Sequence, residues 1–425
     1  MGRDDAGLGS AGDAVRRLPA GRTLRCTLAT LALAACHAGT PAPAHRAIPA
    51  ALPESLGFDA ARLDRVKEYL ASQVDSAYPG AVVAVGRHGR LALLAAAGHY
   101  SDGDDRPVEP ETVYDLASLT KVIGLTTACM LLVQEGKLDL DAPAQRYVPE
   151  FRGPDKDKIT IRLLLTHSAG LAADLPLFDS TRSRAAALTM VDTSPLLSAP
   201  GTSFVYSDLS AIVLMQVVER ITGQPLDAYL EARVFGPLGM TATRFNPPPA
   251  WLDHIAPTEL DTMFRHRLLR GEVHDESAAR LGGVSGNAGL FSDALDLARF
   301  ATWLMAVRAG APGHGPGVGQ PELRSETVRL FTARQNIPPG SSRALGWDTP
   351  SDSGYSSAGS RLSRRSFGHT GYTGTSIWMD PDNDVFIILL TNRVNPTRAN
   401  TRILQVRATV ADLVAEALVG DGRGR

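Results

Sequence analysis

The hydrophobic and polar positions at the start of the folded chain follow first a helical repeat and then a strand repeat. Apolar side chains recur at helical spacing from Asp59, a residue type that often caps helices, to about residue 74. The runs AVVAVGR (81–87) and LALLAAAG (91–98) are nearly continuous in apolar residues, and a His88-Gly89 turn separates them. These patterns predict a helix followed by an antiparallel hairpin.

The middle of the chain follows the helical pattern, and the end of the chain shows strands followed by a last helix. Residues from about 138 to 300 read as mostly helical, and one clear helix over 209–222 stops at Gly223. The run GHGPGVG (313–319) predicts a loop insertion. Strand character then returns over 366–371, 373–380 and 385–392, with a turn at 381–384, and a last helix is expected from about 400 to 418.

The order helix, strands, helical block, strands, helix predicts an α+β fold. We expect an antiparallel sheet built from both ends of the chain and flanked by the N-terminal and C-terminal helices. A mostly helical subdomain, inserted at about 138–300, would fold against this sheet and leave a cleft for a site. The predicted folded domain covers 56–418, and residues 419–425 are expected to form a disordered tail.

The first 55 residues are predicted to be a targeting signal and a flexible tether rather than part of the folded domain. Arginines precede the apolar run LATLALAA (28–35), which is shorter than the about 20 residues that a membrane-spanning helix needs. The ending Leu33-Ala34-Ala35-Cys36 resembles the lipobox of bacterial lipoproteins, which implies cleavage before Cys36 and lipid attachment to it. An ordinary signal peptide with a chance cysteine is the alternative. We therefore predict a signal peptide over 1–36, a flexible tether over 37–55 and an exported, periplasmic, membrane-anchored protein.

The composition narrows the function classes. With 44% hydrophobic and 21% charged residues, the 425-residue chain is typical of a soluble globular protein. A net charge of −2 creates no field that would gather nucleic acid, so we predict no nucleic-acid partner. Of three cysteines, Cys26 and Cys36 lie in the targeting region, and Cys129 in the run CMLLV is expected to be a small buried apolar residue. A disulfide framework and a catalytic cysteine are therefore not expected.

The segment Ser118-Leu119-Thr120-Lys121 carries the chemistry that the sequence suggests first. If a helix begins near Ser118, residues three apart share a face, so the Lys121 amine can reach the Ser118 hydroxyl. A serine hydroxyl is a weak nucleophile until a neighbour accepts its proton. The N-terminus of a helix also favours the developing oxyanion. Ser118 is thus a candidate nucleophile, and Lys121 is its candidate proton partner.

Two further segments have both a structural and a functional interpretation. Tyr206-Ser207-Asp208 precedes the predicted helix over 209–222, where Asp208 could simply be the helix cap and Tyr206 a core residue. His369-Thr370-Gly371 lies on a predicted strand, where small residues at a strand edge are an equally ordinary reading. The order and separation of all three segments favour the functional interpretation.

Together the three segments resemble the active-site motifs of serine β-lactamases and penicillin-binding proteins. The chain is most similar to class C β-lactamases and to the related esterases and low-molecular-weight penicillin-binding proteins, over essentially residues 56–418. The stretches that support the resemblance are IRLLLTHSAGL (161–171), GEVHDESAARLGGVSGNAGLFS (271–292) and FGHTGYTGTSIWMDP (367–381).

The resemblance implies a role for each matching residue. Ser118 would be the acylated nucleophile, Lys121 its proton partner, and Tyr206 the general base for serine and later for water. Asp208 would contact the lysine and the substrate amide. The substrate-binding strand would be His369, Thr370, Gly371 and Tyr372, and the backbone N–H groups of Ser118 and Tyr372 would form the oxyanion hole.

Two positions depart from the family pattern. Asp208 stands where the family usually has asparagine, and its charge is expected to raise the pKa of Lys121, which favours Tyr206 as the base. His369 stands where the family usually has lysine, and a histidine offers a substrate carboxylate a positive charge only near or below pH ~6.5. Substrates that carry a carboxylate are therefore expected to bind less tightly, and ester hydrolysis stays open.

The remaining candidate residues and motifs give weaker indications of function. His274-Asp275-Glu276 is expected to form a wall of the cleft rather than a metal site, because adjacent loop residues rarely converge on one ion. His167 is expected to be a buried, hydrogen-bonded structural histidine. GHGPGVG lacks the lysine and the following helix of a phosphate-binding loop. We predict neither a cofactor nor a metal.

The predicted function is acyl transfer to water by a monomeric serine hydrolase, through an acyl-enzyme on Ser118. The substrate would be a β-lactam, a D-alanyl peptide of peptidoglycan or an ester, and D-alanyl-D-alanine carboxypeptidase is the leading specific alternative. A protein that is acylated without turnover would instead act as a penicillin-binding sensor. A scaffold with a decayed site is a third possibility, which the intact motifs disfavour.

Overall fold

The computed structural model describes residues 48–311 and 320–419. The predicted signal peptide and its Cys36, the tether up to residue 47, the loop insertion at 313–319 and the tail from residue 420 lie outside the described residues. The predicted tether does not extend to residue 55, because Ala50 bridges Leu91 and a 3₁₀ turn covers Pro53–Leu56. The folded body therefore begins several residues earlier than expected.

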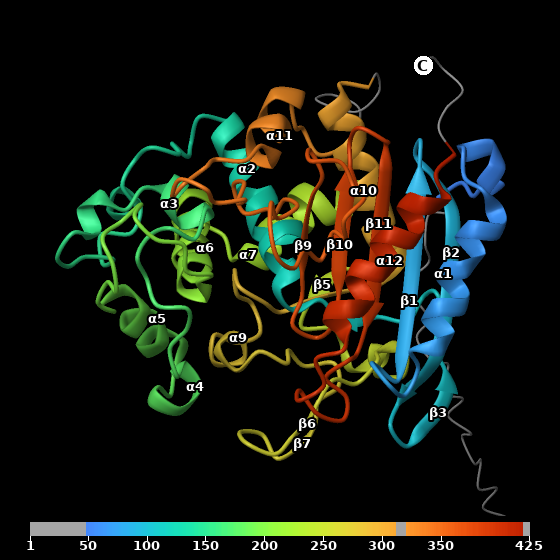
Figure 1. Cartoon of the computed structure of the whole chain (residues 1–425). Helices are drawn as coiled ribbons and strands as arrows, with labels where there is room; N and C mark the ends of the chain where they lie inside the picture. Colours follow the sequence, from blue (N-terminus) through green and yellow to red (C-terminus); the bar gives the residue numbers. More distant parts are fainter. Residues whose placement is uncertain (1–47, 312–319, 420–425) are drawn as a thin grey trace, which may run out of the picture. The chain divides into compact units, whose positions relative to one another are not determined.

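A six-stranded antiparallel sheet joins the two ends of the folded body (Figure 1). Its order is β3-β2-β1-β11-β10-β9, so strands from the start and the end of the chain meet where β1 pairs with β11. The α+β fold is thereby confirmed, with the sheet built from both chain ends as predicted. The strands are β1 (Gly80–Arg87), β2 (Arg90–Ser101), β3 (Asp104–Pro107), β9 (Phe367–Thr370), β10 (Ser376–Asp380) and β11 (Val385–Thr391).

The two terminal helices, α1 (Ala60–Ser72) and α12 (Ile403–Ala417), pack on one face of this sheet (Figure 1). Strand side chains alternate between faces, so Val83 of β1 packs in this layer, whereas Val82 belongs to the larger core on the opposite face. The Asp59 carboxylate accepts the backbone N–H of Arg62 and caps α1, as the sequence predicts.

The opposite face of the sheet is covered by α10 and by the helical region that supplies most of the core. The stretch Ala117–Gln134 is apolar and long enough to cross a membrane, but 83% of it is buried inside the protein, as in a core helix. The predicted helix over 209–222 is α6, and Gly223 ends it in a left-handed conformation. The helices here are α2 (Thr127–Gln134), α3 (Ile161–Leu165), α4 (Leu177–Ser180), α5 (Arg184–Asp192), α6 (Asp208–Thr222), α7 (Leu226–Leu230), α8 (Gly236–Leu238), α9 (Glu276–Arg280), α10 (Ala294–Ala309) and α11 (Ser325–Thr332).

Short strands lie just before and within the region that the sequence predicts as mostly helical. A three-stranded sheet has the order β4-β8-β5, and a separate hairpin pairs β6 with β7. β4 matters for the site because Ser118 follows it closely. These strands are β4 (Tyr114–Asp115), β5 (Arg244–Phe245), β6 (Leu260–Asp261), β7 (Arg267–Leu268) and β8 (Leu290–Ser292).

Candidate active site

Ser118 lies on a tight turn between β4 and the buried helical stretch. Ala117 adopts a left-handed backbone conformation with φ of 46°, which is strained for a residue with a side chain. A 3₁₀ turn over Ala117–Leu119 and a π-helical turn over Lys121–Thr126 precede α2. The predicted regular helix from Ser118 is therefore irregular at its start. Even so, Lys121 Nζ donates to Ser118 Oγ at 3.0 Å, the contact that the three-residue spacing predicts.

The strained turn is fixed by hydrogen bonds within its own segment and by one from the distant residue His274. The Asp115 carboxylate accepts the backbone N–H of Ala117 at 2.8 Å and that of His274 at 2.7 Å. The Thr120 hydroxyl donates to the Ala117 carbonyl at 2.7 Å. Ser118 is thus held rigidly at the surface of the core, which is the preorganisation that an attacking hydroxyl requires.

Lys121 is almost fully buried beneath Ser118 and is held by three oxygen atoms. Besides Ser118, its Nζ donates to the Asn287 carbonyl at 2.8 Å and forms an ion pair with Asp208 Oδ1 at 2.7 Å. Burial alone would lower the pKa of Lys121, but attraction to Asp208 and to Tyr206 outweighs it and raises that pKa above its ordinary value. The lysine is therefore an ammonium at neutral pH, in agreement with the expected effect of Asp208.

Asp208 is directed at the lysine and does not cap the helix that follows it. The cap of α6 is Ser207, whose hydroxyl accepts the backbone N–H of Ser210 and donates to the Ala172 carbonyl at 2.6 Å. This arrangement leaves the Asp208 carboxylate free to pair with Lys121. The structural reading of Asp208 as an N-cap is therefore wrong.

The Tyr206 ring lies next to three side chains from different segments: Lys121, His369 and His167. Its centroid lies 5.0 Å from Lys121 Nζ, 5.8 Å from the His369 ring and 4.7 Å from the His167 ring. Within the described part of the chain its buried hydroxyl makes no well-formed hydrogen bond, although it attracts the Lys121 charge. The phenol oxygen is thus available to a proton from another group.

His369 is buried on β9, and its imidazole is neutral. Its Nδ1 lies 2.8 Å from the Thr370 carbonyl, and its buried Nε2 has no hydrogen-bond partner among the described residues. Burial lowers the pKa of His369 well below its ordinary value, and the charges of Arg343 and Lys121 lower it further. The expectation that this histidine becomes cationic near pH ~6.5 is therefore wrong in this environment.

The backbone after His369 is locked in place at Gly371 and Tyr372. A Cβ on Gly371 would lie 2.3 Å from the Leu116 carbonyl oxygen, so only glycine allows β9 to approach the Ser118 segment this closely. The buried Arg393 donates from Nε to the Tyr372 carbonyl at 2.8 Å, and Arg407 donates to the Gly371 carbonyl at 2.5 Å. The peptide groups beside Tyr372 are consequently well fixed.

Arg343 is a site residue that the sequence reasoning missed. Its guanidinium carbon lies 5.4 Å from the Tyr206 ring centroid, and its Nη1 is buried without a hydrogen bond to any described residue. Its Nε is 3.8 Å from the Asp348 carboxylate, a loose ion pair. No motif marks Arg343, because it lies in an irregular segment well before His369 in the sequence.

These groups surround a cavity of about 350 Å³. Lys121 and Asp208 do not line it; they lie behind Ser118 and reach the cavity only through the serine and Tyr206. Of the predicted catalytic and substrate-binding residues, the other six all line it, together with three arginines. The prediction that His274-Asp275-Glu276 forms a wall of the cleft is wrong, because none of these three residues lines this cavity. The lining residues are Ser118, Tyr206, Arg343, Asp348, His369, Thr370, Gly371, Tyr372, Arg393, Thr401, Ile403, Leu404 and Arg407.

The two other histidines that the sequence singles out support this cavity from behind. His167 is buried, accepts the Ser207 backbone N–H at 3.1 Å and has a pKa held well below its ordinary value by burial, next to Arg343 and Lys121. It is a hydrogen-bonded histidine as predicted, and it also packs on Tyr206. His274 stacks on Tyr372 at 5.7 Å and pairs with Glu259 at 3.0 Å.

Comparison with known proteins shows the family to which the chain belongs. A profile of the Beta-lactamase family matches residues 64–411. A Salmonella agona (strain SL483) protein named "Putative D-alanyl-D-alanine carboxypeptidase" is 34% identical over 393 residues, which cover 83% of this chain and 88% of that protein.

Among solved structures, similarity is found to "EstCE1, a hydrolase with promiscuous acyltransferase activity" (TM-score 0.66, 23% identity, 85% of this chain and 99% of that one). A penicillin-binding protein homolog from Caulobacter crescentus is also similar (TM-score 0.64, 19% identity, 83% and 97%). At these identities the two structures support the fold of this chain and nothing more specific. Fold, profile and relatives lead to one conclusion: the chain belongs to the Beta-lactamase family and is a hydrolase of the serine β-lactamase and penicillin-binding-protein superfamily.

Proposed function

We propose that Ser118 is the acylated nucleophile of this hydrolase. The observation that carries the proposal is the 3.0 Å contact between Lys121 Nζ and Ser118 Oγ at the wall of a cavity that Tyr206 also lines. Ser118 attacks a carbonyl carbon, the leaving group departs with a proton, and water then releases the acyl group. The backbone N–H groups of Ser118 and Tyr372 bind the oxyanion.

We assign proton transfer to Tyr206 rather than to Lys121. An ammonium held by Asp208 has no lone pair with which to accept the serine proton. The Tyr206 ring lies 5.0 Å from Lys121 Nζ and its hydroxyl has no hydrogen-bond partner among the described residues, so Tyr206 accepts that proton and returns it to the leaving group. Lys121 thus acts by orienting Ser118 and stabilising negative charge beside it.

For the substrate we propose a peptide that ends in D-alanyl-D-alanine and carries a free carboxylate. Three arginines line the cavity against one acidic residue, Asp348. Arg343 offers the buried, unpaired Nη1 that a carboxylate would satisfy. The name of the 34% identical relative agrees with this substrate class. Arg343 would then supply the charge that the neutral His369 lacks.

The proposal is tested by the release of D-alanine from a peptide ending in D-Ala-D-Ala. We expect turnover by the wild-type protein and none by Ser118→Ala. Arg343→Gln should raise KM about tenfold for this peptide, equivalent to about 1.4 kcal/mol, but should change KM little for its C-terminal amide. Arg152→Gln, an exposed arginine outside the cavity, is the matched control.

A carboxylesterase is the second candidate, and one observation favours it: the imidazole of His369 is neutral where the family usually has a lysine. A short p-nitrophenyl ester would then turn over faster than the peptide, and Arg343→Gln would leave that ester's KM unchanged. Stoichiometric labelling by a penicillin without turnover would instead identify a sensor.

We further propose that the chain is exported and works as a lipid-anchored monomer in the periplasm. The basic and apolar pattern that ends in Leu33-Ala34-Ala35-Cys36 supports cleavage before Cys36, followed by a tether and one hydrolase domain with its helical insertion. Metabolic labelling with palmitate should mark the wild-type chain in the membrane fraction. Cys36→Ser should lose the label and become soluble.

A further inference from the structure

A second and larger cavity, of about 860 Å³, lies at the end of the β10–β11 hairpin that is remote from Ser118. β10 begins at Ser376, which pairs with Thr370 of the candidate active site, and ends at the turn over 381–384 that borders this second cavity. The two cavities share no lining residue. A role for the second cavity is therefore separable from the hydrolase site.

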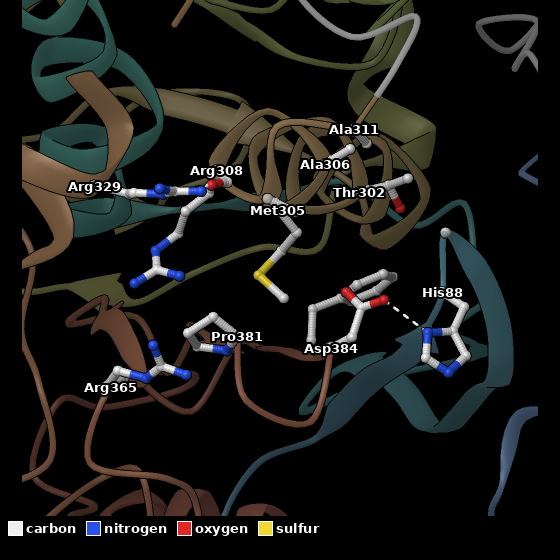
Figure 2. A pocket seen from close by; sticks show the side chains of 13 residues that line it. His88, Thr302, Met305, Ala306, Arg308, Ala311, Arg329, Arg365, Pro381 and Asp384 are labelled. Carbon is white, nitrogen blue, oxygen red and sulfur yellow. Dashed lines mark hydrogen bonds and ion pairs between the residues drawn. The ribbon is translucent and has the colours of Figure 1, made fainter. Parts of the chain in front are cut away.

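Three arginines from three segments converge on this cavity. Arg308 comes from the last turn of α10, Arg329 from α11 and Arg365 from the segment before β9. Figure 2 shows the side chains of Arg308 and Arg365 turned toward one another across the cavity. Burial lowers the pKa of Arg308, the charges of Arg365 and Arg329 lower it further, and Asp382 offsets only part of this repulsion.

The carboxylates at the cavity neutralise only part of this charge. Arg365 pairs with Asp382, and His88 pairs with Asp384 at 2.7 Å. In the part of the chain that the structure describes, neither Arg308 nor Arg329 has a carboxylate within ion-pair distance. Two guanidinium charges thus remain for an external anion.

The guanidinium groups of Arg308 and Arg329 are each held by a hydrogen bond from Nε. Arg308 Nε donates to the Thr332 hydroxyl at 3.1 Å, and Arg329 Nε donates to the Arg308 carbonyl at 3.0 Å. Neither arginine uses its outer Nη groups in a hydrogen bond to a described residue. Fixed guanidinium groups with free outer donors suit the oxygen atoms of a phosphate group.

Apolar side chains also line the cavity. Met305 projects into it from α10 beside Thr302, and Pro381 lies opposite, beside Arg365 (Figure 2). Phe386 is a further apolar lining residue. We propose that the cavity binds an organic phosphate, with its dianionic head on Arg308 and Arg329 and an apolar body against Met305 and Phe386. The phosphate could belong to a soluble ester or to the headgroup of an acidic lipid.

Calorimetric titration of the full chain with octyl phosphate, below its micelle concentration, tests the proposal. We expect saturable binding that weakens at least about tenfold in Arg308→Gln/Arg329→Gln and at least about threefold in Arg329→Gln, whose exposed side chain can be changed without disturbing the fold. Arg152→Gln and Ser118→Ala should bind like the wild type. Octanol should bind much more weakly than octyl phosphate.

Flotation with vesicles distinguishes the two sources of the phosphate. Binding to vesicles that contain phosphatidic acid, but not to phosphatidylcholine vesicles, assigns the site to a lipid headgroup; titration by octyl phosphate alone assigns it to a soluble ester. Equal affinity of the folded double variant and the wild type, equal affinity for octanol, or no saturation by octyl phosphate overturns the proposal. Because Ser118→Ala keeps the second cavity, these outcomes do not depend on the hydrolase assignment.

Discussion

The pair of Lys121 and Asp208 decides how protons move at this site. With an asparagine at position 208 the buried Lys121 amine would lack its anionic partner, and burial would act to lower its pKa. The carboxylate reverses this effect and keeps a buried cation 2.7 Å away. A single side chain thus changes the lysine from a possible base into a fixed positive charge.

Asp208→Asn tests this account through the pH dependence of kcat. Removing the anion lowers the pKa of Lys121, so the ammonium is lost at lower pH and the alkaline limb of the profile moves to lower pH. The control is Asp64→Asn on the exposed face of α1. An unchanged alkaline limb would show that the charge state of Lys121 does not matter for turnover.

The predictable elements are those whose signals are local. The N-cap of α1, the β1–β2 hairpin, the C-cap of α6 and the three late strands follow from periodicity, capping residues and turns. The irregular start at Ser118 does not, because Asp115, which accepts the Ala117 backbone N–H, is itself held by a tertiary hydrogen bond from the His274 backbone. The two-residue strands between α8 and α10 are too short to leave a periodic signal.

The cap of α1 offers a test at the scale of one element. Asp59→Ala removes the acceptor of the Arg62 backbone N–H and should lower the free energy of unfolding by about 1 kcal/mol. Because α1 contributes no residue to the lining of the active-site cavity, kcat should not change. Urea unfolding and ester turnover of the same preparation give both values. A loss of activity without a loss of stability would contradict this separation.

At the scale of the whole molecule, the site depends on segments that are far apart in the sequence. Motifs with a local pattern, such as Ser118-x-x-Lys121, can be identified from the sequence. The burial that neutralises His369 and the position of Arg343 cannot, because both depend on how the irregular segment around residue 343 packs against β9 and Tyr206. The sequence therefore predicts the chemical groups better than their charge states.

Burial of two neutral histidines also affects the stability of the whole molecule. The pKa values of His167 and His369 lie well below the ordinary value, so below pH ~6.5 the unfolded chain takes up protons that the native protein excludes. The free energy of unfolding should therefore fall as the pH falls, by up to about 1.4 kcal/mol per pH unit for each histidine.

His167→Gln should remove one of these two contributions, whatever its effect on absolute stability. Urea unfolding at pH ~7.5 and pH ~5.5 would show a smaller acid loss in this variant than in the wild type. His266→Asn, which changes an exposed histidine, should keep the wild-type difference. An identical acid loss in His167→Gln would mean that this imidazole is protonated in the native state.

The measurement that tests the central claim most directly is intact-mass analysis after brief exposure to a penicillin and, separately, to a fluorophosphonate. We predict a mass increase of one acyl or phosphonyl group on the wild-type protein, mapped to the peptide that contains Ser118, and none on Ser118→Ala. Equal labelling of Ser118→Ala, or a label on any other residue of the wild type, would contradict the assignment of the nucleophile.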